Sequence, residues 1–321
     1  MTMIKKLLVA LPLTLALAAP SFAQDFPERA MRIVHGFGAG GNADTVSRIM
    51  AEAISADLGE PVVVESRPGA GGTVASGYVA SEAPDGYTMQ LLVGGHAVAA
   101  ALYNELPYDS VNDFTFLSTL GQFPFFVAAR AGEYESITAL IEAARAEPGS
   151  IVIGHSGVGS TQHLTGELLG LQTGAEFIHV PYKGGAAAST ALMGGEVNVI
   201  IDTGTVISGQ AEAGVYDILA VTSAERWPDA PDVPTLNETV APGFDVVSWT
   251  GLGAPAGVPD DVVEILSTSI GKALAQPDVQ EKIAALGAAP GGSTSEELKA
   301  LIERQIAVWS EVIEAAGIER R

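Results

Sequence analysis

Two glycine-rich turns are the segments of this chain best suited to hold a small molecule. The first, residues 36–44, follows the apolar run 31–35, and the second, residues 154–164, follows the run 150–153. Each turn leads into a helical pattern, so its backbone N–H groups lie at a helix N-terminus. A turn with few side chains lets an anion approach these N–H groups closely. Both turns therefore predict an anion-binding site.

Hydroxyl side chains add further donors to the second turn. Ser156, Ser160 and Thr161 offer hydroxyl and backbone groups that can donate to a carboxylate. Ser160 or Thr161 also fits the N-cap of the following helix, and an N-cap residue can still contact a ligand. The second turn is therefore expected to bind the carboxylate end of a ligand.

Two charged residues further along the chain are also candidates for ligand contact. Asp202 ends the apolar run 197–201. It is expected either to meet an amino or hydroxyl group of the ligand or to cap the segment after Gly204. Lys183 precedes two glycines and is expected either to neutralise an anion or to form a solvated ion pair.

A nicotinamide-dependent oxidoreductase is the main alternative to a binding protein. Gly36, Gly38 and Gly41 satisfy G-x-G-x-x-G after a strand, and Glu65 stands about where a ribose-binding acid would sit. The N-terminal signal described below argues against this function, because it directs the unfolded chain into a compartment that lacks a free nicotinamide pool.

A serine hydrolase is a weaker alternative. The segment Gly154-His155-Ser156 resembles the start of a nucleophile elbow, but Val158 stands where G-x-S-x-G requires glycine. The five histidines show no metal-ligand spacing, and the chain has no cysteine. His163 is expected to pack in the first turn of its helix. We therefore expect no catalytic residues, no metal and no cofactor.

The first 23 residues have the pattern of a secretory signal peptide. Lys5 and Lys6 precede an apolar stretch, and residues 21–23 form a small-x-small cleavage site. No paired arginines precede this stretch, and there is no cysteine to carry a lipid anchor. The sequence therefore predicts cleavage after Ala23, export through a Sec-type route and a periplasmic destination.

The mature chain is strongly acidic. The full sequence has 38 acidic and 16 basic residues, for a net charge of −22, and cleavage removes two of the lysines. Such a charge disfavours nucleic acids and anionic lipid surfaces as partners. It still permits a small anion to bind where backbone N–H groups supply the attraction.

Short β-rich runs alternate with helical patterns along most of the chain, which indicates an α/β architecture. A helix is expected from Asn42 to Leu58, with Gly59 as its stop, and another begins at a Thr294/Glu297 capping box. In that last helix Trp309 is expected to pack in the core.

Extended segments at residues 121–125 and 245–249 have the spacing of two hinge crossings. They predict two lobes with a ligand cleft between them. Lobe 1 would comprise residues 24–124 plus 246–321, and lobe 2 residues 125–245.

Seven motifs in this order resemble the Bug (TctC) family, the periplasmic solute-binding proteins of tripartite tricarboxylate transporters. The resemblance covers nearly all of the mature chain. The motifs are Phe37-x-x-Gly40-Gly41-x-x-Asp44, residues 65–72, Pro84-Asp85-Gly86-Tyr87-Thr88, Leu102-Tyr103 with residues 106–109, Ser156-Gly157-x-Gly159-Ser160-x-x-His163-Leu164, residues 180–185 and residues 254–259.

The resemblance implies a type II periplasmic binding protein fold, with two mixed-sheet α/β lobes joined by two extended hinge crossings. It implies a monomer without catalysis that closes on a small carboxylate: a di- or tricarboxylate, an acidic amino acid or an aromatic acid. Membrane components of the transporter would be its partners. The implied ligand-binding residues are Phe37, Ala39, Gly40, Gly41 and Asp44 of the first turn, Ser156, Ser160, Thr161 and His163 of the second, and Tyr182 and Asp202 at the other end of the ligand.

Overall fold

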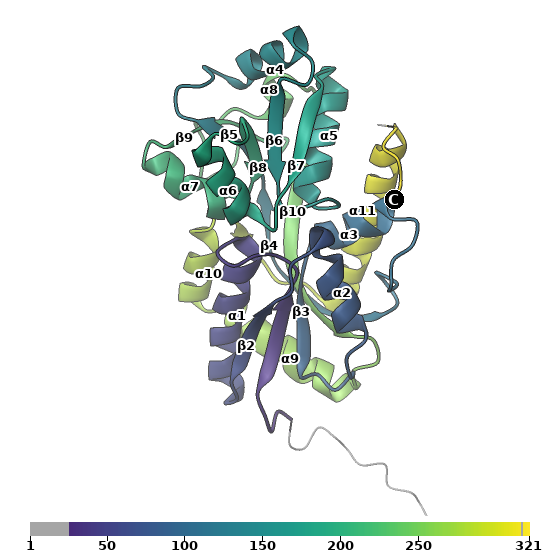
Figure 1. Ribbon diagram of the computed structural model, residues 1–321. Helices are drawn as coiled ribbons and strands as arrows, with labels where there is room; N and C mark the ends of the chain where they lie inside the picture. Colours follow the sequence, from purple (N-terminus) through teal and green to yellow (C-terminus); the bar gives the residue numbers. More distant parts are fainter. Residues whose placement is uncertain (1–25, 316) are drawn as a thin grey trace, which may run out of the picture.

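The alternating β-rich and helical segments form two mixed sheets, each flanked by helices (Figure 1). This computed structural model describes residues 26–315 and 317–321. The predicted leader and its cleavage site lie outside the described residues. No helix in the described part of the chain is long and apolar enough to cross a membrane.

The first sheet is built from both ends of the chain. Its strand order is β11-β4-β10-β3-β1-β2, with β1 parallel to β2 and β3, and β10 antiparallel to β3 and β4. Its elements are β1 (Met31–His35), α1 (Asn42–Leu58), β2 (Val62–Ser66), the 3-10 turn η2 (Ala70–Gly72), α2 (Thr73–Ala80), β3 (Thr88–Val93), α3 (Gly95–Leu102), β4 (Phe114–Pro124), β10 (Val247–Pro255), α9 (Asp260–Leu274), α10 (Pro277–Ala284), β11 (Ala289–Pro290) and α11 (Ser295–Ala315).

The second sheet comes from the middle of the chain. Its order is β7-β6-β8-β5-β9, with β6 parallel to β7 and β8, and β5 antiparallel to β8 and β9. Its elements are β5 (Phe126–Arg130), α4 (Ile137–Ala146), β6 (Ile151–His155), α5 (Thr161–Thr173), β7 (Phe177–Pro181), α6 (Gly185–Gly194), β8 (Val199–Asp202), α7 (Gly204–Glu212), β9 (Tyr216–Val221) and α8 (Leu236–Thr239). The predicted mixed-sheet α/β class is confirmed.

Successive residues of β1 pack on opposite faces of the first sheet. Ile33 belongs to the core cluster that contains Val46 and Met50 of α1, whereas Val34 packs in the cluster that contains Val79 of α2 and Trp249. Such alternation is the consequence of the two-residue period of a strand. Helices therefore cover both faces of the first sheet.

Both helices predicted in detail are confirmed. α1 runs from Asn42 to Leu58 and ends at Gly59, whose φ of 81° is the left-handed conformation that glycine adopts without strain. Thr294 and Glu297 form the predicted capping box at the start of α11. Trp309 is 4 % exposed and packs in the core.

The chain passes between the sheets at Phe125 and between β9 and β10. Thr222 joins these crossings, because its hydroxyl accepts from the Phe125 N–H at 2.8 Å and donates to the Val246 carbonyl at 2.7 Å. β4 and β10 pair along their length and lead from the first sheet toward the second (Figure 1). We use lobe 1 and lobe 2 for the parts predicted above, which divide at these crossings.

Candidate functional site

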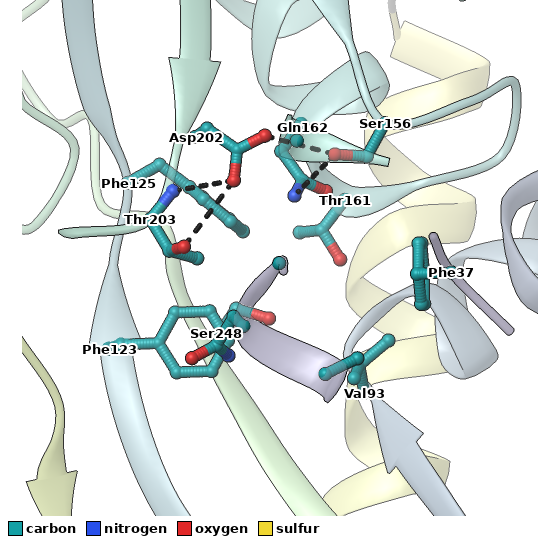
Figure 2. A pocket seen from close by; sticks show the side chains of 15 residues that line it. Phe37, Val93, Phe123, Phe125, Ser156, Thr161, Gln162, Asp202, Thr203 and Ser248 are labelled. Atoms are coloured by element: carbon teal, nitrogen blue, oxygen red, sulfur yellow. Dashed lines mark hydrogen bonds between the residues drawn. The ribbon is translucent and has the colours of Figure 1, made fainter. Parts of the chain in front are cut away.

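A small cavity lies between the lobes (Figure 2). Its free volume is about 40 Å³, enough for about three water molecules at roughly 10–15 Å³ each. Both lobes and both crossings contribute to its wall. The fifteen lining residues are Phe37, Gly41, Asn42, Ala43, Val93, Gly95, Phe123, Phe125, Ser156, Thr161, Gln162, Gly185, Asp202, Thr203 and Ser248.

The N-termini of five helices meet at this cavity. Among its lining residues are the first residues of α1, α3, α5 and α6, and the N-cap of α7, Thr203. Free N–H groups and the helix dipoles make such ends attractive to anions. The fifteen lining residues include no lysine, arginine or histidine. The arrangement can therefore attract a small anion by backbone and hydroxyl donors rather than by ion pairs.

Asp202 is the one acidic residue in this lining set. Its carboxyl group accepts from the Thr203 N–H at 2.8 Å and from the Ser156 hydroxyl at 3.0 Å (Figure 2). Burial raises the pKa of Asp202 above its ordinary value, although these hydrogen bonds act in the opposite direction. A Cβ added at Gly185 would lie 2.5 Å from this carboxyl group, so α6 can begin here only with glycine.

The second glycine-rich turn places its hydroxyl groups in different roles. Ser160 is the predicted N-cap of α5 and accepts from the His163 N–H at 3.2 Å. Thr161 lines the cavity, and Gln162 donates to the Ser156 hydroxyl at 3.2 Å. The turn thus presents Ser156, Thr161 and Gln162 to the cavity and holds Ser160 behind them.

The first turn contacts the opposite lobe. The Gly38 N–H donates to the Lys183 carbonyl at 2.7 Å, and a Cβ at Gly38 would lie 2.9 Å from the same oxygen. Asn42 accepts from the Thr205 hydroxyl at 3.0 Å. These two bonds join lobe 1 directly to lobe 2.

Asp44 supports the first turn from behind. It accepts from the Gly40 N–H at 3.0 Å and pairs with Arg48 at 2.9 Å, and His35 lies 3.3 Å away. Burial acts to raise the pKa of Asp44, but the bonds from Arg48 and Gly40 hold it below its ordinary value. Phe37 and Gly41 line the cavity, whereas exposed Ala39 and Gly40 are outside the lining set.

His163 and Tyr182 also lie outside the lining set. The imidazole of His163 packs against that of His155, with 4.6 Å between ring centroids and the rings tilted by 34°, and its Nε2 lies 3.4 Å from Glu167. Burial, followed by the neighbouring imidazoles, lowers the pKa of His155 to about 3. The Tyr182 N–H donates to the His155 carbonyl. The structure thus brings together Phe37, Gly41, Ser156, Thr161 and Asp202 at the cavity and holds the other predicted residues around it.

Sequence reasoning did not select ten of the lining residues. Phe123, Phe125 and Ser248 lie at the crossings, so the predicted hinges could have identified them as part of a cleft. Asn42, Ala43, Gly95, Gln162, Gly185 and Thr203 lie at helix starts, and Val93 ends a strand. What these ten residues share is their position at the ends of helices and strands or at the crossings, and not the chemistry of their side chains.

The surroundings of Ser156 do not support a serine hydrolase. The partners of its hydroxyl are Asp202 and Gln162. His155, next in sequence, instead bonds with Gly157 within the turn. The usual base of a nucleophilic serine is a histidine or a lysine, and neither is among the partners of the Ser156 hydroxyl. Within the described residues, moreover, no group of three or more acidic or histidine side chains is arranged to hold a metal.

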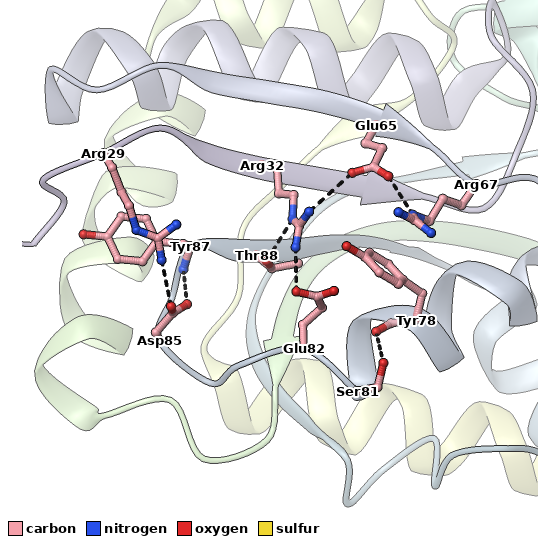
Figure 3. A network of polar contacts seen from close by, with 10 residues as sticks. All are labelled: Arg29, Arg32, Glu65, Arg67, Tyr78, Ser81, Glu82, Asp85, Tyr87 and Thr88. Atoms are coloured by element: carbon pink, nitrogen blue, oxygen red, sulfur yellow. Dashed lines mark hydrogen bonds and ion pairs between the residues drawn. The ribbon is translucent and has the colours of Figure 1, made fainter.

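The carboxylate of Glu65 pairs with arginines (Figure 3). It lies 2.6 Å from Arg67 and 3.7 Å from Arg32, and Arg32 also pairs with Glu82 at 2.6 Å. Arg29 pairs with Asp85 at 2.9 Å. We call these six residues the outer-face network. Glu65 lies opposite Val34, near the start of the glycine-rich turn, but its carboxylate is engaged by Arg67 and Arg32.

Known proteins resemble this chain over most of its length. Residues 46–318 match the family model of the tripartite tricarboxylate transporter family receptor, TctC. The chain belongs to this family. Among its curated TctC-type relatives, BugT from Bordetella pertussis is 33 % identical over 307 residues, which are 95 % of this chain and 94 % of BugT. A Pseudomonas protein encoded between tcbD and tcbE is 35 % identical over 307 residues, 95 % of this chain and 91 % of that protein.

Solved structures show the same fold. The periplasmic binding protein BugD is 36 % identical with a TM-score of 0.88, over 92 % of this chain and 100 % of BugD. An R. palustris protein solved with adipate is 34 % identical, with a TM-score of 0.88 over 92 % of this chain and 99 % of that one. MatC from Rhodopseudomonas palustris, solved with malate, is 32 % identical, with a TM-score of 0.85 over 90 % of this chain and 100 % of MatC. The predicted family and its two-lobed fold are thus confirmed.

Proposed function

We propose that this TctC family member captures a small carboxylated metabolite between its lobes in the periplasm and delivers it to a tripartite tricarboxylate transporter. The observation that carries the proposal is the meeting of five helix N-termini at a cavity lined by no basic side chain. Such a site favours a carboxylate over a neutral ligand. Structural relatives solved with adipate and with malate support the same class.

Ligand entry would require the lobes to separate. The Gly38 N–H bonds to the Lys183 carbonyl, and the Thr205 hydroxyl bonds to Asn42, so direct hydrogen bonds join the two lobes and would break on opening. Thr222 and the paired strands β4 and β10 are the natural hinge, because they lie where the chain crosses between lobes. In this proposal, Phe37, Gly41, Ser156, Thr161 and Asp202 contact the ligand directly. Ala39, Gly40, Asp44, Ser160, His163 and Tyr182 would act through the shape of the turns or through water.

A thermal-shift and calorimetric screen of residues 24–321 tests the ligand class. The panel contains di- and tricarboxylates, acidic amino acids, aromatic acids and nicotinamide dinucleotides, with the methyl esters of each acid as controls. A ligand at a hundred times its Kd stabilises the protein by about 2.7 kcal/mol. Stabilisation by an acid but not by its ester is expected. A response to dinucleotides alone, or equal responses to acids and esters, would refute carboxylate capture.

Delivery to a transporter is tested in cells. A strain that lacks this chain should lose uptake of the identified acid, and periplasmic expression of the chain should restore it. The Gly38→Ala variant, which is expected to hinder closure, should restore uptake poorly. Uptake that continues unchanged in the deletion strain would contradict the transport role.

We also propose that the protein is a monomer. Light scattering should give the mass of a monomer.

A further inference from the structure

A second, smaller cavity lies inside lobe 1 behind the wall of the interlobe cavity. Phe37, Val93 and Gly95 line both spaces. The inner cavity has a free volume of about 10 Å³, close to the minimum of roughly 10–15 Å³ that one water molecule needs. Its polar lining residues include Ser76, Gln90, His96 and Tyr108.

A chain of hydrogen bonds fixes the orientation of these polar groups. The Ser110 carbonyl can only accept, so His96 Nε2, at 2.8 Å from it, must carry the proton. Burial lowers the pKa of His96 to about 4, so the ring is neutral near pH 7 and its Nδ1 is an acceptor. Ser76, at 3.3 Å, therefore donates to Nδ1. The Ser76 oxygen in turn accepts from Gln90 Nε2 at 2.8 Å.

The direction of these hydrogen bonds leaves two polar groups free to bind a small guest molecule or group in the inner cavity. Because the Gln90 amide nitrogen must face Ser76, the amide oxygen Oε1 remains as an acceptor. Gln90 Oε1 and the Tyr108 hydroxyl are both buried and have no hydrogen-bond partner within 3.5 Å among the described residues, although the Ser76 and Ser110 hydroxyls lie near enough to Tyr108 to oppose the rise that burial causes in its pKa. Gln90 is 3 % and Tyr108 7 % exposed. An unpaired buried polar atom costs about 1–3 kcal/mol, so a guest that pairs with both would be retained.

We propose that the inner cavity is a binding site for a single O–H group, which donates to Gln90 Oε1 and accepts from the Tyr108 hydroxyl. A carboxylate fits poorly because it cannot donate to Gln90, and a methyl group leaves both atoms unpaired. Two sources supply this chemistry: an ordered water molecule, or a hydroxyl substituent of the ligand that enters past Phe37 and Val93. The second source rests on the proposed function and would make the site selective for hydroxy acids.

Malate and succinate distinguish the two sources, because they differ only by one hydroxyl group. Their Kd values are measured with the wild-type protein and with Tyr108→Phe, Gln90→Leu and the control Tyr134→Phe, which changes a tyrosine outside both cavities. If the ligand supplies the hydroxyl, malate binds at least tenfold more tightly than succinate to the wild type. That ratio then falls to within about twofold in Tyr108→Phe and Gln90→Leu and persists in Tyr134→Phe.

If water is the guest, the two ligands bind alike, and a crystal structure of the unliganded protein shows one water within hydrogen-bond distance of Gln90 Oε1 and the Tyr108 oxygen. An inner cavity that stays empty in crystals of both the unliganded and the malate-bound protein overturns the site. Failure of the proposed function is a separate result: neither acid binds, while the unliganded crystal still decides whether the inner cavity holds water. Gln90→Leu replaces a buried polar side chain of β3 that also bonds Ser76, so Tyr108→Phe, which keeps the ring, is the deciding variant.

Discussion

On the outer face of lobe 1, three arginines pair with three carboxylates, whereas the interlobe cavity is lined by one buried carboxyl group and no basic side chain. Arg32 and Glu82 of the outer-face network have 33 % and 26 % of their side chains exposed. Asp202 in the cavity is 2 % exposed. The same acidic chain thus places its formal charges in two very different environments.

This difference between the outer face and the cavity shows how an acidic protein can recognise an anion. An ion pair on the surface is screened by water and salt, and its worth is small. A basic side chain buried in the cleft would have to lose its hydration each time the lobes closed. Helix N-termini and hydroxyl groups are already oriented by the fold, so they attract a carboxylate with little rearrangement. The comparison predicts large effects from changes in the cleft and small ones from changes on the outer face.

The largest effect is expected from Gly38→Ala. The added Cβ would lie 2.9 Å from the Lys183 carbonyl of the opposite lobe, so it would obstruct closure while leaving each lobe intact. Ligand affinity should fall at least tenfold, or about 1.4 kcal/mol, with no change in urea unfolding of the unliganded protein. Gly209→Ala in α7, whose Cβ would meet nothing within 4 Å, is the control. Unchanged affinity in Gly38→Ala would mean that these lobes close differently.

Thr161→Val tests the hydroxyl donors at the start of α5. The substitution keeps the shape but removes the hydroxyl group from the cavity wall. Affinity for the carboxylate should weaken by about 1–3 kcal/mol, the value of a hydrogen bond to a charged group, as measured by calorimetry. Thr190→Val, on the exposed side of α6, should leave affinity unchanged. Equal losses in both variants would locate the ligand elsewhere.

Thr222→Val tests the junction of the two crossings. It leaves the buried Phe125 N–H and Val246 carbonyl without their hydroxyl partner. The free energy of unfolding should fall by about 1–3 kcal/mol, measured by urea denaturation, whereas Thr222→Ser should retain most of it. A Val variant as stable as the wild type would show that other groups form hydrogen bonds with the Phe125 N–H and the Val246 carbonyl.

Asp202→Asn separates two ligand classes and alters the response to pH. An acid with an ammonium group, such as aspartate, should bind at least tenfold more weakly, because it loses a buried charge partner. Malate should keep its affinity within about threefold, since the amide still accepts hydrogen bonds. Equal losses for both acids would place the ammonium group away from Asp202.

The stability effect of Asp202 follows from its raised pKa. The folded protein holds this proton more tightly than the unfolded chain does. Its contribution to stability is therefore complete below the ordinary aspartate pKa and is lost as pH rises through the raised folded value. Urea denaturation at about pH 4 and pH 8 should show the wild type losing stability relative to Asp202→Asn as pH rises. A constant difference would contradict a raised pKa.

Local patterns predicted most of the fold. The period of Val46, Met50 and Ile54 and the stop at Gly59 defined α1, because a buried helical stripe and a left-handed glycine are encoded within a few residues. Positions in the cavity were harder to predict. Asp44 and His163 have side chains suited to bind ligands. Asp44 instead pairs with Arg48, and His163 lies beside Glu167, so both side chains are outside the set that lines the cavity. Which face of a turn meets the ligand depends on contacts made only in the folded chain.

The smallest effects are expected in the outer-face network. Arg67 stacks on Tyr78, with 3.4 Å between the guanidinium carbon and the ring centroid, and Arg32 pairs with Glu82 at 2.6 Å. Arg32→Gln and Arg67→Gln should each lower the free energy of unfolding by less than about 1 kcal/mol, and less still at high salt. Carboxylate affinity should remain within about twofold, measured by calorimetry with Glu82→Gln as the partner variant. A larger loss of affinity would mean that this face is coupled to the cleft through β1 and β2, and the two regions could no longer be treated as independent.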